Sequence, residues 1–354
     1  MKTKRIWMVG VFFCMGLGSL SACGKRQSSP AEKIHIGVAY YNQGDTFLNQ
    51  LIDSFREKLE GMESSKLDIT LTIRGASGSQ RTQDDQVHEL IDAGCNVLCV
   101  NLVDRTNPSE IIELARENDV PIIFFNREPV AEDMMQWEKL YYVGADAKQS
   151  GTMQGELAAD AILSNHRIDR NRDGKIQYVV LEGEPGHQDS IIRTESAAEA
   201  LKASGIELEK LCCRIANWNR SQAQSRMLQM ISQYQNKIEL VLANNDDMAL
   251  GAVDAYQKLN YTETDIPVFF GIDGTDVGLE AVADGRLLGT VYNDKEGQAE
   301  AMAELAAAVV TGDGTKDVSL KNDKYIYLPY FKVTDETVGE FLAYSDLSSA
   351  APDD

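Results

Sequence analysis

Basic residues, histidine and cysteine are all scarce in this sequence. Its 354 residues include 34 lysines and arginines against 55 aspartates and glutamates, and the formal charge is −21. An acidic surface without a basic stripe repels phosphate polyanions, which makes nucleic acid and anionic membrane surfaces unsuitable partners. The four histidines are scattered, and no Cys and His spacing is typical of zinc. Four cysteines are expected to be buried free thiols: Cys95, Cys99, Cys212 and Cys213.

A hydrophobic leader opens the chain. Three basic residues precede an apolar run over residues 6–20, and this run ends in Leu20-Ser21-Ala22-Cys23. The order is typical of a secretory signal followed by a lipoprotein cleavage site, so we expect residues 1–22 to be removed and Cys23 to be lipidated. The alternative is a simple signal peptide, or a membrane anchor helix with an incidental cysteine. Lipidation predicts a protein held on the extracytoplasmic face of the cell membrane by its lipid anchor alone.

Apolar runs alternate with helical patterns along the rest of the chain. The runs lie near 34–40, 67–73, 97–100, 120–125, 176–181, 238–243, 266–272 and 288–292, and most precede apolar residues at helical spacing. Several runs are apolar on both faces, as in strands that helices cover on both sides. The length suggests two domains, and VPIIFF at 120–125 resembles IPVFFG at 266–271. The predicted fold class is α/β, with two similar doubly wound parallel-sheet lobes.

Polar side chains that can form paired hydrogen bonds stand after these runs, where the carboxyl ends of parallel strands face a ligand crevice. They are Asp45, Asn101, His187, Asp189, Arg193, Asn245, Asp273 and Asn293. Carboxylate, amide and guanidinium groups match the vicinal hydroxyls of a sugar. Phe47 and Trp218 can cover the faces of its ring. The residues therefore predict a monosaccharide site.

Each of these residues also has a structural interpretation when it is taken alone. Asp45 can cap a helix, Asn101 and Asn245 can satisfy loop backbone groups, and Arg193 can lie on a solvated helix face. The two aromatic residues can be ordinary core residues. Only their shared position after strands favours a binding site.

A second pattern predicts a calcium site. Residues 169–177, DRNRDGKIQ, match the first nine positions of an EF-hand loop, with oxygen ligands at Asp169, Asn171, Asp173 and Gln177 and the carbonyl of Lys175. Position 12 is Val180, so the bidentate carboxylate must come from elsewhere, and Glu239 is the candidate. The alternative is an acidic turn that contains glycine. We expect a structural Ca²⁺ and not a switch.

Taken together, these motifs resemble the periplasmic galactose/glucose-binding protein family over essentially the whole mature chain. The segments that carry the resemblance are IGVAYYNQGDTF, NLVD, FFNREP, DRNRDGKIQ, EGEPGHQDSIIR, NWN, IELVLANNDDMALGAV, FFGIDG and GTVYND. The resemblance implies that the ten residues above bind the sugar and that the six calcium ligands are as given. It also implies two lobes joined by three crossings, near Val120, Asn293–Asp294 and Leu328–Pro329. The departures are the lipoprotein signal, Gln188 in place of a usual proline, and an acidic tail.

The resulting domain prediction has five parts. Residues 1–22 form the signal, 23–33 the lipidated cysteine and tether, 34–119 plus 294–328 the first lobe, 120–293 plus 329–345 the second lobe with the calcium loop, and 346–354 a flexible tail. We expect a monomer that binds glucose or galactose and delivers it to an ABC permease. A membrane-tethered sensor that serves a chemoreceptor or a two-component kinase is the alternative.

Two other classes of protein are less consistent with the sequence. An enzyme could use His187, Asp189 and Arg193 as acid and base, but there is no nucleophile elbow, glycine-rich phosphate loop or catalytic zinc set. A two-lobed transcriptional regulator needs an amino-terminal DNA-binding module, and here a hydrophobic leader occupies that place. We therefore expect binding without catalysis.

Overall fold

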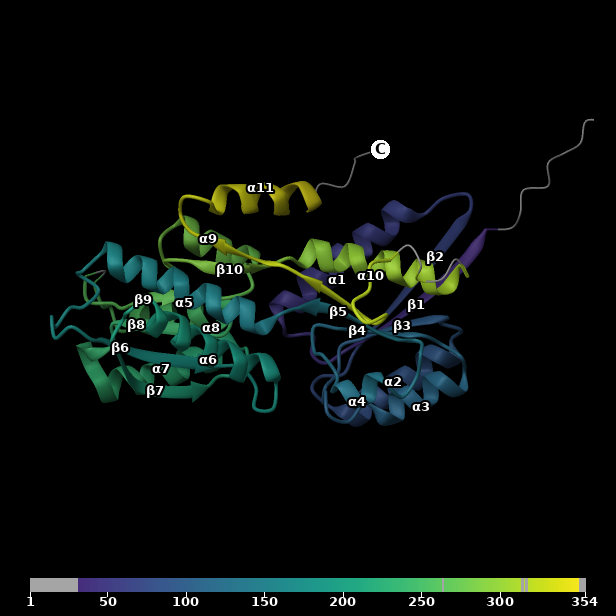
Figure 1. Cartoon of the computed structure of the whole chain (residues 1–354), viewed down its shortest axis with the longest axis horizontal. Helices are drawn as coiled ribbons and strands as arrows, with labels where there is room; N and C mark the ends of the chain where they lie inside the picture. Colours follow the sequence, from purple (N-terminus) through teal and green to yellow (C-terminus); the bar gives the residue numbers. More distant parts are fainter. Residues whose placement is uncertain (1–30, 263, 313–314, 316–317, 350–354) are drawn as a thin grey trace, which may run out of the picture.

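Two lobes, each built on a parallel sheet, lie end to end in the computed structural model (Figure 1). The structure describes residues 31–262, 264–312, 315 and 318–349. The chain passes between the lobes at Ala145–Asp146, at Asn293–Asp294 and at Leu328–Pro329, so that each lobe contains segments that are distant in sequence.

The first lobe has a six-stranded sheet in the order β11-β5-β4-β3-β1-β2, and all its neighbouring strands are parallel. Helices α1 and α10 cover one face, and α2 and α3 cover the other (Figure 1). Strands β3 and β4 are buried at every residue because both faces are covered. The elements are β1 Glu32–Tyr40, α1 Thr46–Met62, β2 Leu67–Gly75, α2 Gln80–Asp92, β3 Val97–Val100, α3 Ser109–Glu117, β4 Ile122–Phe125, α4 Ala131–Met134, β5 Leu140–Ala145, α10 Lys295–Val310 and β11 Tyr325–Leu328.

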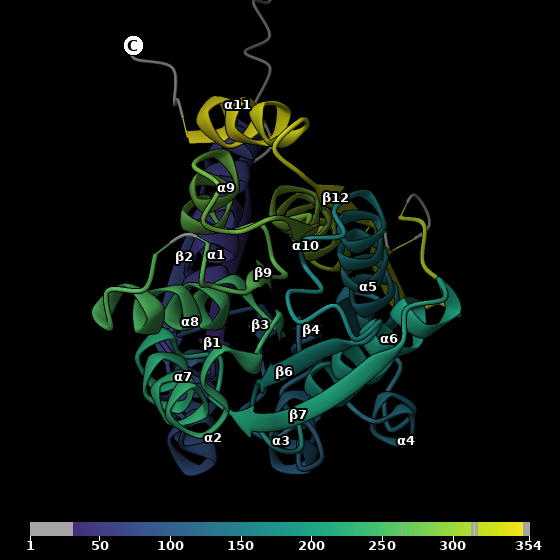
Figure 2. The same cartoon turned by 90° about the vertical axis from the view of Figure 1, so that its left-hand side faces the viewer.

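The second lobe has a four-stranded parallel sheet in the order β7-β6-β8-β9. Isolated bridges, Phe270 with Gly289 and Asp273 with Tyr292, connect the end of β9 to the segment that contains β10. Strand β10 pairs antiparallel with β12. Helices α5 and α6 cover one face of this sheet, and α7 and α8 cover the other (Figure 2). The elements are α5 Ala147–Ser164, β6 Ile176–Glu182, α6 Gln188–Ala203, β7 Leu208–Ile215, α7 Arg220–Tyr234, a 3₁₀ turn Gln235–Lys237, β8 Leu240–Ala243, α8 Asp246–Lys258, β9 Val268–Phe270, α9 Asp276–Ala283, β10 Thr290–Asn293, β12 Tyr330–Val333 and α11 Val338–Ser349.

The predicted first crossing near Val120 is wrong. Strand β4 pairs with β3 at Leu98–Ile122, and β5 pairs with β4, so residues 120–145 belong to the first lobe. The chain crosses only after Ala145, where α5 begins in the second lobe. An apolar run predicts a buried strand but does not indicate which sheet it joins. The later two crossings lie where the sequence places them.

Both predicted termini of the folded part also shift. Strand β1 begins at Glu32 and pairs with Leu67, so the end of the predicted tether is already sheet. Helix α11 runs to Ser349 and includes the first residues of the predicted tail. The leader, Cys23 and residues 350–354 lie outside the described residues. Within the described part of the chain, no helix has the length and hydropathy required to cross a membrane.

Candidate functional site

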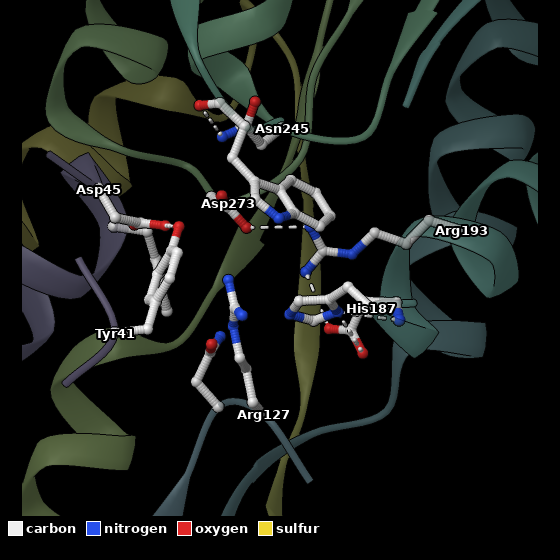
Figure 3. Close-up of a pocket in the computed structure, with 11 residues that line it drawn as sticks. Tyr41, Asp45, Arg127, His187, Arg193, Asn245 and Asp273 are labelled. Carbon is white, nitrogen blue, oxygen red and sulfur yellow. Dashed lines mark hydrogen bonds and ion pairs between the residues drawn. The ribbon is translucent and has the colours of Figure 1, made fainter. Parts of the chain in front are cut away.

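The carboxyl ends of the strands of both lobes meet at a polar cavity, which we call the interlobe cavity (Figure 3). It lies where open α/β sheets bind ligands. Eight of the ten predicted sugar ligands line it, and Asn101 and Asn293 do not. Its lining residues are Tyr41, Asp45, Phe47, Asn126 and Arg127 from the first lobe, and His187, Asp189, Arg193, Trp218, Asn245 and Asp273 from the second.

Asp45 both caps helix α1 and lines the interlobe cavity. Its Oδ1 accepts a hydrogen bond of 2.9 Å from the backbone N–H of Leu48, and its Oδ2 accepts one of 2.7 Å from the hydroxyl of Tyr41. The capping interpretation is therefore correct, since the side chain satisfies an N–H that has no partner inside the helix. These two bonds fix the orientation of the carboxylate at the cavity wall.

Arg193 is buried between two carboxylates and does not lie on a solvated helix face. The residue is only 3% exposed. Its Nη1 lies 3.3 Å from Asp273 Oδ1, and its Nη2 lies 3.7 Å from Asp189 Oδ2 (Figure 3). Nη1 also donates to the carbonyl of Asn244 at 2.7 Å, and Nη2 donates to the hydroxyl of Tyr330 at 3.1 Å. Its Nε is buried and has no hydrogen-bond partner among the described residues.

Burial and nearby charges set the protonation of this part of the cavity. Burial raises the pKa of Asp189 and that of Asp273, and the Arg193 guanidinium opposes both shifts. Burial lowers the pKa of His187 well below its usual value, and three guanidinium groups lower it further, so the imidazole is neutral. Its Nδ1 accepts a bond of 3.2 Å from the backbone N–H of Asp189, which places the ring proton on Nε2 as a donor. The approach of 3.9 Å between Nδ1 and Asp189 Oδ1 is therefore not an ion pair.

The two predicted stacking residues line the interlobe cavity from opposite lobes. Phe47 is 4% exposed and lies in the first turn of α1, and Trp218 is 9% exposed and lies just before α7. Asn217 and Trp218 have φ values of 52° and 58°, and this turn presses the indole against Gly183. A Cβ at Gly183 would lie 2.1 Å from the indole, so only glycine fits there. Rings in such positions can cover the C–H faces of a sugar.

Asn101 and Asn293 support the cavity wall or the hinge and do not line the cavity. The Oδ1 of Asn101 accepts from the N–H of Tyr41 at 3.3 Å, and its Nδ2 donates to the carbonyl of Phe125 at 3.1 Å and to Asn126 Oδ1 at 3.0 Å. Asn293, at the second crossing, accepts a bond of 2.7 Å from the side chain of Gln298. The structure therefore supports the alternative in which Asn101 satisfies backbone groups.

Three residues that line the cavity were missed by the sequence analysis: Tyr41, Asn126 and Arg127. A signal was present, because Tyr41 follows β1 directly and Asn126 and Arg127 follow β4. The φ of Asn126 is 59°, a conformation that asparagine tolerates better than most residues, and it turns the chain directly after the strand. The sequence analysis predicted only Asp45 and Phe47 after the first run, and no residue after the run at 120–125.

A buried carboxylate behind the cavity positions Asp273. Asp246 is fully buried; its Oδ2 accepts from the N–H and the hydroxyl of Thr275 at 2.9 and 3.2 Å, and its Oδ1 accepts from the hydroxyl of Thr290 at 2.5 Å. Burial raises the pKa of Asp246 to about 7, and the bonds from the threonines oppose the shift. Asp273 itself has a φ of 113°, which is unusual for any residue except glycine. The bonds to Asp246 hold this strained turn in place.

The residues of the predicted calcium loop converge at the opposite end of strand β6 from the interlobe cavity. Asp169 accepts from the N–H groups of Asp173 and Gly174 at 3.2 and 3.0 Å, and Gly174 makes the turn at a φ of 81°. The side-chain amide of Asn171 donates to Asp173 Oδ2 at 3.0 Å and to Gln177 Oε1 at 2.9 Å. The loop therefore has the compact form that its sequence predicts.

Glu239, the residue before strand β8, contacts this loop. Its Oε1 accepts from the N–H of Arg170 at 2.7 Å, and its Oε2 accepts from the N–H of Gln177 at 3.1 Å. Among the described residues, none of Asp169, Asp173 and Glu239 forms an ion pair with a basic side chain, and no group of three His, Cys, Asp or Glu side chains is arranged as a metal site by itself. The available donors are a mixture of carboxylate, amide and carbonyl oxygens.

This architecture, with a polar cavity between two doubly wound lobes, is that of a type I two-lobed solute-binding protein. Residues 36–314 match the model of the periplasmic binding protein domain, and the chain belongs to that family. A D-galactose/methyl-galactoside-binding periplasmic protein of Haemophilus influenzae is 36% identical to it over 337 residues, which is 94% of this chain and 97% of that protein. A xylitol-binding protein of Mycolicibacterium smegmatis is 28% identical over 89% of this chain and 83% of its own length.

Solved structures show the same arrangement. An ABC transporter solute-binding protein of Bacillus halodurans with bound myo-inositol superimposes with a TM-score of 0.74 and is 28% identical, covering 89% of this chain and 99% of that one. The predicted fold class and the predicted family are thereby confirmed.

Proposed function

We propose that this protein binds a monosaccharide, galactose or glucose, in the interlobe cavity and delivers it to an ABC permease. The observation that carries the proposal is the cluster of Arg193, Asp189 and Asp273 beside Trp218, because it combines paired charged hydrogen-bonding groups with an aromatic face. The Haemophilus relative named for D-galactose supports the choice of a hexose. The step is binding and lobe closure, and it includes no covalent chemistry.

The energetics are sufficient for such a ligand. A hydrogen bond to a charged group contributes roughly 1.5–3 kcal/mol, and micromolar affinity requires about 8 kcal/mol. Three carboxylates, two guanidinium groups and a neutral His187 line the interlobe cavity. A few good bonds from this set, together with burial of the ring faces, are enough.

Calorimetry on the unliganded protein tests this proposal directly. We expect galactose or glucose to bind with a micromolar or lower dissociation constant, and ribose, xylitol and myo-inositol to bind at least tenfold more weakly. Tighter binding of myo-inositol or xylitol would assign a different polyol to the same cavity. If none of the five ligands bound, the sugar-binding proposal would be wrong.

We also propose that Ca²⁺ occupies the loop at residues 169–177. Calcium takes six to eight oxygen ligands, and the chain offers side-chain oxygens of Asp169, Asn171, Asp173 and Gln177, the carbonyl of Lys175 and both carboxylate oxygens of Glu239. The convergence of the loop's oxygen-bearing side chains with Glu239 supports a cation there. The ion would join the loop to strand β8 and stabilise the second lobe.

Finally, we propose that Cys23 carries the lipid that holds the protein at the membrane. Replacing Cys23 by serine should release the protein from the membrane pellet into the soluble extracytoplasmic fraction, since the acceptor thiol is lost. The matched control is Cys14→Ser, which changes a thiol inside the leader and leaves the cleavage motif intact. Membrane association of the Cys23→Ser protein would show that another segment anchors it.

A further inference from the structure

Arg127 belongs to the first lobe but reaches across the cleft. It is 5% exposed; its Nη1 donates to the carbonyl of Val103 at 3.0 Å, and its guanidinium carbon lies 3.6 Å from the centre of the Tyr41 ring. Both of those partners are in the first lobe, so they keep the side chain in place when the lobes move. Its Nη2 donates to Glu184 Oε2 at 2.7 Å, and Glu184 follows β6 in the second lobe.

This ion pair joins the two cleft walls away from the hinge. Among the ion pairs of the described residues, one other pair links the lobes, and it joins Lys295 to Asp276 beside the second crossing. The side chains of Arg127 and Glu184 are 5% and 29% exposed, so the pair is partly shielded from water, and the Glu184 carboxylate remains within reach of salt. Opening of the lobes must break it, because its two residues move with different lobes.

The pair also lies at an edge of the interlobe cavity. A second hollow, lined by residues 103–106, Arg127 and residues 184–187, adjoins the cavity on the other side of the pair. Arg127 and His187 line both spaces, whereas Glu184 lines only the outer one. Figure 3 shows the Arg127 side chain extending between Tyr41 and His187. The pair therefore lies between the interlobe cavity and this outer hollow.

We propose that the Arg127–Glu184 ion pair is a latch that holds the cleft closed and sets the rate of sugar release. In this role Glu184 is a positioning residue that does not touch the sugar, and it acts only through Arg127. The proposal rests on sugar binding in the interlobe cavity for its kinetic consequence, but the latch itself is a property of the two lobes and can be measured without a ligand.

The test is Glu184→Gln, which keeps the shape of the side chain and removes its charge. We expect the dissociation rate of the bound hexose to rise about five- to tenfold in stopped-flow measurements, with less than a twofold change in the association rate. The ratio of galactose to glucose affinity should stay unchanged, because Glu184 does not line the interlobe cavity. Added salt should speed release from the wild type and have little effect on release from the variant.

The matched control is Glu128→Gln. Glu128 is next to Arg127 in sequence, and its carboxylate accepts from the Tyr327 hydroxyl at 2.9 Å within the first lobe, so it carries the same charge without bridging the cleft. This control should release sugar at the wild-type rate. Equal release rates for wild type and both variants would overturn the latch.

Small-angle scattering on the sugar-free protein separates the latch from the assignment of the ligand. Loss of the pair should shift Glu184→Gln toward open lobes and increase its radius of gyration relative to wild type and Glu128→Gln. If no hexose binds but this increase is seen, the latch stands and the ligand proposal fails. If hexose binds and the radius and release rate are unchanged, the latch fails alone.

Discussion

Replacing Asp273 by asparagine should weaken hexose binding by about ten- to a hundredfold and leave the melting temperature nearly unchanged. The carboxylate lies 3.3 Å from Arg193 and lines the interlobe cavity, and a charged hydrogen bond contributes roughly 1.5–3 kcal/mol. Asparagine is the better replacement than alanine because the φ of Asp273 is 113°, and asparagine tolerates positive φ better. Titration calorimetry gives the affinity, and thermal unfolding gives the stability.

Asp284→Asn is the matched control for this change. It removes the same charge from the same lobe at a half-exposed site, where the ion-pair partner of Asp284 among the described residues is the neighbouring Arg286 at 2.8 Å. We expect its affinity to equal that of the wild type. If the Asp273→Asn protein bound hexose as tightly as the wild type, the sugar would not contact this carboxylate, although the protein would still bind sugar.

Removal of calcium should lower the melting temperature by about 5–10 °C in the absence of sugar. A ligand present at 100 times its dissociation constant stabilises the folded state by about 2.7 kcal/mol, and each kcal/mol shifts the transition of a domain of roughly 150–250 residues, such as the second lobe, by about 2–4 °C. Scanning calorimetry with chelator, and then with Ca²⁺ added back, measures the effect. If neither chelator nor excess Ca²⁺ changed the melting temperature, a structural calcium ion would be excluded.

Two variants test whether the change in melting temperature comes from the loop at residues 169–177. Glu239→Gln removes the charge that faces the loop from strand β8, so we expect it to lower the melting temperature and to abolish most of the response to chelator. Lys175→Ala is the control, because that residue is predicted to contribute only its carbonyl and the substitution keeps it. The Lys175→Ala protein should respond to chelator as the wild type does.

Most residues of the cavity could be predicted by the rule that ligand-binding residues follow the carboxyl ends of parallel strands. This rule depends only on the order of strands and helices along the chain. Buried runs such as β8 ended where the sequence indicated, and Asn245, two residues after β8, lines the cavity. The rule does not give side-chain direction. Asn101 follows β3 in the same way, but it turns toward backbone groups and Asn126. The difference is set by the backbone angles and neighbours of each strand end, which periodicity does not contain.

The first crossing between the lobes is a second feature that could not be predicted from the sequence. The residues IIFF of β4 are buried on both faces, and a strand in either lobe could have this apolar sequence. Their membership depends on which strand lies beside them, and that depends on how helices pack over the whole sheet. The later two crossings, which the family resemblance implied, are marked in the structure by Pro329 between β11 and β12 and by Asp294, which caps the helix that follows Asn293.

The return of the chain to its first lobe determines when that lobe can finish folding. Its edge strand β11 and its covering helix α10 are synthesised after nearly all of the second lobe. A partly made chain therefore exposes an unpaired β5 edge and the uncovered side of α1, and it depends on contacts between residues that are far apart in sequence, which form slowly. The first lobe therefore completes its sheet later than a lobe made from one continuous segment would.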